Sequence, residues 1–355
     1  MSKLFSPLSL RGLTFKNRIF VSPMCQYSAE DGIPNLWHMV HLGSRAVGGA
    51  ALVMAEATAV SPEGRISPAD LGIWSEVHVN AFAPIVEFLK EEGAVPAIQI
   101  AHAGRKASTD VPWHGGQPLG PAAGGWETVA PSALPFASGW PAPRALAREE
   151  LDGIVTQFAE AAIRSLEAGF EVVEIHMAHG YLLHEFLSPI ANQREDEYGG
   201  SLENRARLPL QVAEAVRAVW PDDKPVFVRI SATDWVEGGW DLAQSIQLTH
   251  WLKLRGIDMI DCSSGGMVMD AKIPAAPGFQ VPFAEAIRRE AGIATGAVGL
   301  ITEPAQAEQI VAMGQADAVF MAREFLRDPY WPLHAARALG VDLPWPVQYA
   351  RAKPR

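Results

Sequence analysis

The sequence has few cysteines and few basic residues, and each shortage excludes a class of protein. Cys25 and Cys262 are the only cysteines among 355 residues. Two cysteines cannot form a disulfide framework, and they lack the paired spacing of a structural zinc site, so we expect a reducing, cytoplasmic location. The 29 basic against 40 acidic residues give a net charge of −11, which repels nucleic acid and anionic membranes. The expected partner is therefore a small-molecule substrate, with neither nucleic acid nor membrane.

Long apolar runs are also missing. Residues 1–18 contain no continuous apolar segment of the kind found in secretion signals. The longest apolar stretch, residues 48–60, is short and interrupted by Glu56. The sequence therefore predicts neither a secretion signal nor a membrane-spanning helix.

Short β-rich runs recur along the chain, and a stretch with helical periodicity follows each of them. The candidate strands are residues 17–24, 50–57, 95–101, 171–176, 225–231, 259–265, 293–299 and 318–323. Eight parallel strands close naturally into a barrel, whereas an open doubly wound sheet more often stops at five or six. We therefore predict an α/β fold, a (β/α)8 TIM barrel, with residues 1–355 as a single domain.

Side-chain alternation within the candidate strands predicts a polar barrel interior. In residues 171–176, Val173 and Ile175 share one face, while Glu174 and His176 share the other. The fifth strand places Arg229 inward in the same way, and a buried arginine needs an anionic partner or a ligand.

A histidine pair at the end of the fourth strand is the strongest candidate for catalysis. His176 and His179 would face opposite sides of a continuing strand, so the chain must turn for both rings to face one substrate, and Gly180 would help that turn. Two imidazole donors could polarise a carbonyl oxygen, and the phenol of Tyr181 could supply a proton. The same spacing would also suit a metal-binding pair or a structural histidine. Besides an enzyme that polarises a carbonyl, a metal-dependent hydrolase or lyase on the same barrel is therefore a second prediction. A non-catalytic flavin carrier is a third.

Two further features lie where this fold binds ligands. Cys25 follows the first strand, where it could contact a flavin ring or simply be a small buried side chain. Glycine-rich loops follow the sixth, seventh and eighth strands, where barrels commonly bind phosphate, and Arg323 could add a charged contact. The loop at residues 104–144 follows the third strand and is predicted to cap the active-site face, with a surface excursion as the alternative.

Taken together, these segments resemble the old yellow enzymes, a family of FMN-dependent ene reductases. PMCQYSA, EATAV, HAGRKA, EIHMAHGYLLHEFLSP, YGGSLENR and PVQYAR carry the resemblance across nearly the whole chain. Cys25 with Tyr27, the His-x-x-His motif and the C-terminal arginine are similar to the thermophilic-like subclass. One departure is Ala322, where family members often have glycine, and a methyl group there requires a negative φ.

The resemblance implies a flavin site, a substrate site and a reaction. It places the isoalloxazine of a non-covalently bound FMN against Pro23, Met24, Cys25, Ala57, Gln99, His176 and Arg229, and the FMN phosphate against Gly299, Ala322 and Arg323. It makes His176 and His179 the carbonyl donors, Tyr181 the proton donor, Cys25 a tuning residue and Tyr27 a substrate contact. NADPH or NADH would reduce the flavin, and the enone would then take the same site.

The resemblance also implies an oligomer. The C-terminal tail, residues 341–355, would carry Arg351 into the substrate site of a partner subunit. The expected assembly is a homodimer, or a homotetramer built from dimers.

Overall fold

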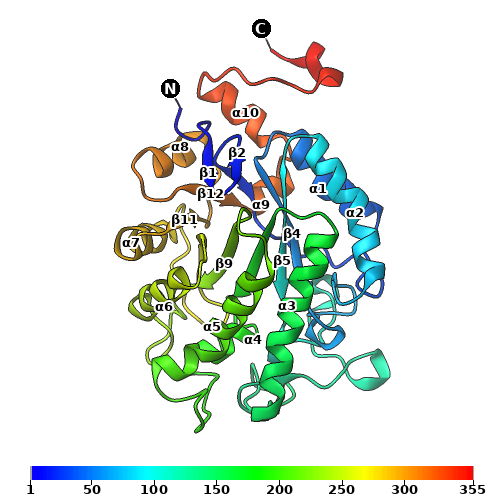
Figure 1. Cartoon of the computed structure of the whole chain (residues 1–355), viewed down its shortest axis with the longest axis vertical. Helices are drawn as coiled ribbons and strands as arrows, with labels where there is room; N and C mark the ends of the chain where they lie inside the picture. The colour runs from blue at the N-terminus through cyan, green and yellow to red at the C-terminus, as the bar shows by residue number, and fades with distance from the viewer. Residues whose placement is uncertain (1, 355) are drawn as a thin grey trace.

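Eight parallel strands close into a barrel in the computed structural model, which describes residues 2–354 (Figure 1). Around the barrel they are β3 (Ile19–Val21), β4 (Leu52–Ala59), β5 (Val95–Ala101), β8 (Val172–Met177), β9 (Val226–Ser231), β10 (Met259–Ser263), β11 (Ala294–Ala297) and β12 (Ala318–Met321). All eight fall on the runs predicted from the sequence, and the (β/α)8 barrel is confirmed.

Helices surround the barrel and connect its strands (Figure 1). They are α1 (Leu36–Val47), α2 (Glu76–Glu91), α3 (Leu151–Glu167), α4 (Leu182–Leu187), α5 (Leu202–Val219), α6 (Leu242–Leu254), α7 (Val281–Ala291), α8 (Pro304–Ala312), α9 (Arg323–Arg327) and α10 (Trp331–Ala338). Side-chain caps set the first residue of several helices. The Asp241 side chain, for example, accepts a hydrogen bond from the Gln244 backbone N–H at 2.9 Å at the start of α6. No helix in residues 2–354 is long and apolar enough to span a membrane.

The alternation predicted for the strands is present. Val173, Ile175 and Val228 belong to the core between barrel and helices, while Phe227 belongs to a separate core inside the barrel. This inner core lies toward the amino ends of the strands, where Phe20 meets Phe320 edge to face with ring centroids 5.3 Å apart.

An N-terminal hairpin, which the sequence did not predict, closes the amino end of the barrel. Its strands are β1 (Leu8–Leu10) and β2 (Leu13–Phe15). Phe15 packs on Phe20 with centroids 4.9 Å apart, and the Arg11 Nε lies 2.6 Å from Asp258 Oδ1, just before β10. The amino end is therefore covered, and barrels of this kind bind their ligands at the carboxyl end of the strands.

The segment at residues 104–144 leaves β5 and contains 3-10 turns and one strand of a short pair, β6 (Val129–Ala130) with β7 (Arg144–Ala145). The C-terminal tail lies at the opposite end of the molecule, over α10 (Figure 1). Its 3-10 helix η6 (Val347–Ala352) contacts the start of α10, where the Tyr349 and Tyr330 hydroxyls are 3.4 Å apart.

Candidate active site

The histidine pair lies on a tight turn between β8 and α4. His179 and Gly180 both have positive φ, +61° and +73°, so the predicted turn forms, with His179 itself sharing the left-handed conformation. A methyl group on Gly180 would overlap the Gly266 carbonyl oxygen. The turn brings the His176 and His179 ring centroids to 5.1 Å at an interplanar angle of 88°.

Backbone and serine contacts orient the two rings. The Ala178 N–H donates to His176 Nδ1 at 3.2 Å. Nδ1 is then an acceptor, so a neutral ring carries its proton on Nε2. His179 Nε2 lies 2.7 Å from the Ser263 hydroxyl at the end of β10, and its backbone N–H donates to Ser231 Oγ at 2.9 Å. Three neighbouring strands therefore fix one histidine.

Burial keeps both imidazoles neutral. It lowers the pKa of His176 and of His179 well below the usual 6.5, and the positive charge of Arg229 lowers both further. Two neutral imidazoles can each present one N–H to an anionic oxygen without a proton having to be gained first.

Tyr181 completes this group. Its ring centroid lies 5.0 Å from that of His176, and burial raises the pKa of its phenol well above 10. The phenol therefore stays protonated, as a general acid must before it acts.

Lys106 is a site residue that sequence reasoning missed, although its motif was noted. Its ammonium donates to the His179 carbonyl oxygen at 2.8 Å and to the Gly266 carbonyl oxygen at 3.1 Å. It also lies 5.1 Å from the Tyr181 ring centroid. Burial lowers the pKa of Lys106 to about 8, so the group places a positive charge beside the histidine turn near neutral pH.

The loop after β3 brings Cys25 and Tyr27 to the same mouth. Both are half-buried. Their direct contact raises the pKa of the Tyr27 phenol and, by a smaller effect than burial, lowers that of the Cys25 thiol. Burial first, then the charges of Asp70 and Glu56, raises the pKa of the Cys25 thiol well above 9. Cys25 is thus a thiol rather than a reactive thiolate. Tyr27 packs edge to face on Trp113 of the segment 104–144.

Charged groups line the barrel beneath the histidines. Gln99 donates to Glu174 Oε1 at 2.8 Å, and Arg229 Nε lies 3.2 Å from Asp261 Oδ2, without the alignment of a hydrogen bond. Burial raises the pKa of Asp261 to about 6 and that of Glu174 well above 4.5. Arg229 is ion-paired with Asp261 on one side and keeps 7% of its surface exposed, so its positive charge fits a ligand with electron-rich atoms over the barrel mouth.

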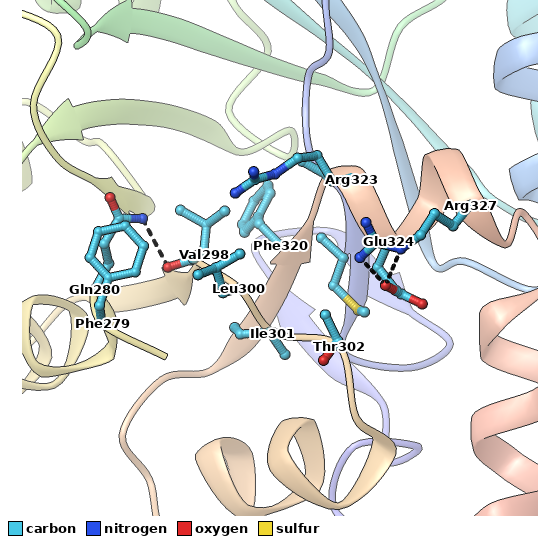
Figure 2. Close-up of a pocket in the computed structure, with 13 residues that line it drawn as sticks. Phe279, Gln280, Val298, Leu300, Ile301, Thr302, Phe320, Arg323, Glu324 and Arg327 are labelled. Carbon is cyan, nitrogen blue, oxygen red and sulfur yellow. Dashed lines mark hydrogen bonds and ion pairs between the residues drawn. The ribbon is translucent and has the colours of Figure 1, made fainter. Parts of the chain in front are cut away.

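A cavity of about 210 Å³ opens between the loops after β11 and β12 (Figure 2). Gly299, at φ +123°, Ala322 and Arg323 line it. Within residues 2–354 Arg323 has no acidic partner within ion-pair distance, whereas Arg327 pairs with Glu324. An unpaired arginine at such a cavity fits an anionic group such as phosphate. The φ of Ala322 is −108°, so its methyl group is accommodated.

The structure thus brings most predicted residues to one end of the barrel. Pro23, Met24, Cys25 and Tyr27 come from the loop after β3, Ala57 and Gln99 from β4 and β5, and Arg229 from β9. Arg351 is the exception: it is exposed on η6, at the opposite end of the molecule (Figure 1).

The rival metal site finds no donor set. In the part of the chain that the structure describes, no three His, Cys, Asp or Glu side chains are grouped to hold a metal ion. The hydrolase or lyase prediction therefore has no support.

Comparison with known proteins agrees with the flavin interpretation. The chain is 49% identical to an NADPH dehydrogenase of Geobacillus thermodenitrificans over 350 residues, 98% of each chain. Among solved structures, morphinone reductase in complex with tetrahydroNAD is 30% identical, with a TM-score of 0.78, over 98% of this chain and 93% of the other. The old yellow enzyme homologue of Zymomonas mobilis is 27% identical, with a TM-score of 0.78, over 97% and 95%.

Residues 3–341 match the NADH:flavin oxidoreductase / NADH oxidase family. The predicted resemblance and the prediction of an FMN-dependent oxidoreductase are both confirmed. The chain belongs to the NADH:flavin oxidoreductase / NADH oxidase family.

Proposed function

We propose that the protein is an NADPH-dependent ene reductase acting on α,β-unsaturated carbonyl or nitro compounds. The observation that carries this proposal is the pair of neutral, orthogonal imidazoles of His176 and His179 at the barrel mouth. Two preorganised N–H donors suit the oxygen of an enone, which becomes negative when hydride adds to the β-carbon.

FMN would supply the hydride chemistry that couples oxidation of a reduced nicotinamide to reduction of the alkene. Pro23, Met24, Cys25, Ala57 and Gln99 would hold its ring, and the positive charge of Arg229 would lie at its electron-rich edge. Gly299, Ala322 and Arg323 would hold its phosphate in the cavity of Figure 2.

The chain's own groups then act on the substrate. His176 and His179 bind the carbonyl oxygen, and Lys106 adds positive potential through the turn. Tyr181 supplies a proton to the α-carbon, and Tyr27 contacts the substrate from the opposite loop. The segment at residues 104–144 caps this mouth, since Lys106 and Trp113 both belong to it, and it limits the entry of water.

The test is spectroscopic. Purified protein should be yellow, NADPH should bleach its flavin absorption without oxygen, and cyclohex-2-enone should restore it. A yellow protein inert to both reagents would be a flavin carrier, and a colourless, metal-loaded protein would support the hydrolase prediction instead. Repeating the reduction with NADH measures the nicotinamide preference, and the name NADPH dehydrogenase of the relatives leads us to expect NADPH.

A second part of the proposal is that two copies complete each other's sites in the cytoplasm. The tail packs only lightly on its own barrel, with Val347 84% exposed and Arg351 exposed. The start of α1 leaves Leu36 and Val40 exposed beside Trp37, whose indole N–H donates to Gln26 in the Cys25 loop. A partner's tail covering this apolar face would bring Arg351 toward the mouth, where its charge could bind nicotinamide or substrate.

Deleting residues 346–355 tests the shared site. The truncated protein should dissociate to monomers in sedimentation velocity runs, and its KM for cyclohex-2-enone should rise. Arg351→Ala is the matched control, because it should raise KM while the dimer persists. Monomeric but kinetically normal protein would exclude the shared site.

A further inference from the structure

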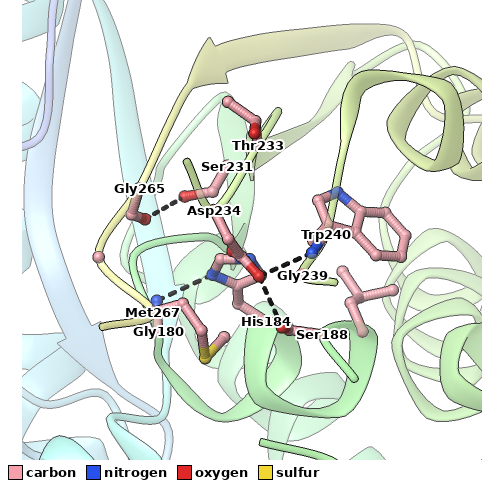
Figure 3. Close-up of polar contacts among 12 residues, drawn as sticks. Gly180, His184, Ser188, Ser231, Thr233, Asp234, Gly239, Trp240, Gly265 and Met267 are labelled. Atoms are coloured by element: carbon pink, nitrogen blue, oxygen red, sulfur yellow. Dashed lines mark hydrogen bonds and ion pairs between the residues drawn. The ribbon is translucent and has the colours of Figure 1, made fainter. Parts of the chain in front are cut away.

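A third histidine lies directly behind the catalytic turn and is fully buried with a carboxylate (Figure 3). His184, on α4, accepts a hydrogen bond at Nδ1 from the Gly180 backbone N–H at 2.9 Å. Its Nε2 lies 3.0 Å from Asp234 Oδ1, outside the angle of a straight hydrogen bond. Neither side chain reaches solvent, so neither contacts the substrate.

The Gly180 contact defines the state of the His184 ring. A nitrogen that accepts a hydrogen bond carries no proton, so the ring is neutral with its proton on Nε2, facing Asp234. Asp234 is thereby the group that selects this tautomer, as carboxylates do for other histidines whose second nitrogen has a task.

Two further contacts fix Asp234. Its Oδ2 accepts from the Ser188 hydroxyl at 2.6 Å and from the Trp240 backbone N–H at 2.8 Å. Burial alone would raise its pKa, but these two hydrogen bonds favour the ionised carboxylate, and the pKa is lowered. The carboxylate is therefore ionised, and its place is set by the end of α4 and the loop after β9 (Figure 3).

The turn needs such a support. Two successive residues, His179 and Gly180, have positive φ, and a non-glycine residue such as His179 adopts that conformation only where its surroundings impose it. The Gly180 N–H is buried, and His184 Nδ1 is its acceptor. Without that acceptor, a turn that satisfies its backbone differently would compete, and the His179 and Tyr181 rings would move with it.

We infer that His184, oriented by Asp234, is a positioning residue that holds the His179–Tyr181 turn in the conformation that binds the substrate oxygen. The inference rests on the proposed function, since the turn matters through the carbonyl that it binds. It adds a buried series of contacts from Asp234 through His184 to Gly180, which supports the groups that contact substrate and transfers no proton.

Two substitutions separate the two ends of the His184 ring. In His184→Asn the amide oxygen can occupy the place of Nδ1 and accept from Gly180, while the contact with Asp234 is lost. In His184→Gln the amide nitrogen can occupy the place of Nε2 and donate to Asp234, while Gly180 loses its acceptor. Both variants bury an amide, so a purely structural role predicts similar effects from both.

The measurements use FMN-loaded protein and cyclohex-2-enone. We expect His184→Gln to raise the Kd of cyclohex-2-enone, read from the flavin absorption, and to slow flavin reoxidation, each by about tenfold. His184→Asn should stay within about threefold of the parent in both. FMN content and melting temperature are recorded for each. Equal losses in both variants, or parent-like constants in His184→Gln, would overturn the inference.

A measurement on the unmodified holoenzyme covers the case in which a variant does not fold. In ¹⁵N-histidine NMR spectra, His184 should show an unprotonated Nδ1 and a protonated Nε2. A protonated Nδ1 overturns the inference. If the parent protein were not reoxidised by cyclohex-2-enone, the proposed function would fail, while the spectrum and the hydrogen exchange of the Gly180 amide would still decide whether His184 holds the turn.

Discussion

The two ends of the barrel interior are built on opposite principles. At the amino end Phe15 of the N-terminal hairpin packs with Phe20, Phe227 and Phe320, and none of the four has water-accessible surface. At the carboxyl end the barrel strands carry Gln99, Glu174, His176, Arg229 and Asp261, and side-chain atoms of Glu174, Arg229 and Asp261 lack hydrogen-bond partners.

Residues near the amino ends of the strands therefore contribute to stability, and residues near the carboxyl ends form the site. Strand β9 shows this within three residues: Phe227 points into the aromatic core, and Arg229, two positions later on the same face, points into the mouth. Changes at the amino end should act on the free energy of unfolding, and changes at the carboxyl end on turnover.

The largest effect is expected at the aromatic end. Phe20→Ala would leave a cavity beside Phe15 and Phe320, and such a truncation costs about 3–5 kcal/mol of unfolding free energy. Denaturant unfolding measures it. The protein that remains folded should keep the parent kcat, and a loss of kcat without a loss of stability would contradict the division.

His176→Ala and His179→Ala should lower the rate of enone reduction and leave the free energy of unfolding nearly unchanged. Loss of one preorganised donor costs about 2.7–4 kcal/mol at the transition state, or roughly a hundred- to a thousandfold in the rate of enone reduction. FMN should stay bound and the melting temperature should change little. Stopped-flow reoxidation by cyclohex-2-enone is the measurement, and unchanged turnover would remove that histidine from the site.

The sequence predicted the features that depend on local pattern. The eight strands follow from β-rich runs before helical stretches, inward Arg229 follows from alternation, and the histidine turn follows from a spacing that a straight strand cannot use. The N-terminal hairpin was missed because its three-residue strands have no periodicity and its partner Asp258 lies far along the chain.

Site residues that depend on loop paths were missed for the same reason. Nothing local to Lys106 indicates that its ammonium reaches His179, because this depends on how the segment at residues 104–144 folds back. His184 looks like an ordinary helical residue until Asp234, 50 residues later, is placed beside it. The roles drawn for individual residues stay predictions until variants are measured.

Tyr181→Phe should have a smaller effect than loss of a histidine. General acids are commonly worth about a hundred- to ten-thousandfold, but water entering the mouth can replace the phenol in part. Reoxidation of the flavin by cyclohex-2-enone should slow more than its reduction by NADPH, because only the first step needs a proton at carbon. Equal slowing of both steps in stopped-flow traces would count against Tyr181 as the donor.

The smallest effect is expected at Cys25, and the second cysteine provides a control. A nucleophilic cysteine cannot be replaced without near-total loss of activity, but the raised pKa of Cys25 keeps it a thiol. Cys25→Ala should therefore remain active, with each half-reaction changed by no more than about tenfold and the flavin reduction potential shifted. Cys262 faces the helices rather than the mouth, so Cys262→Ala should lower the melting temperature without moving that potential.

Iodoacetamide should alkylate Cys25 slowly at pH 8, because little thiolate is present when the pKa lies well above 9. Fast alkylation, or loss of both half-reactions in Cys25→Ala with FMN still bound, would show that Cys25 does more than tune the flavin.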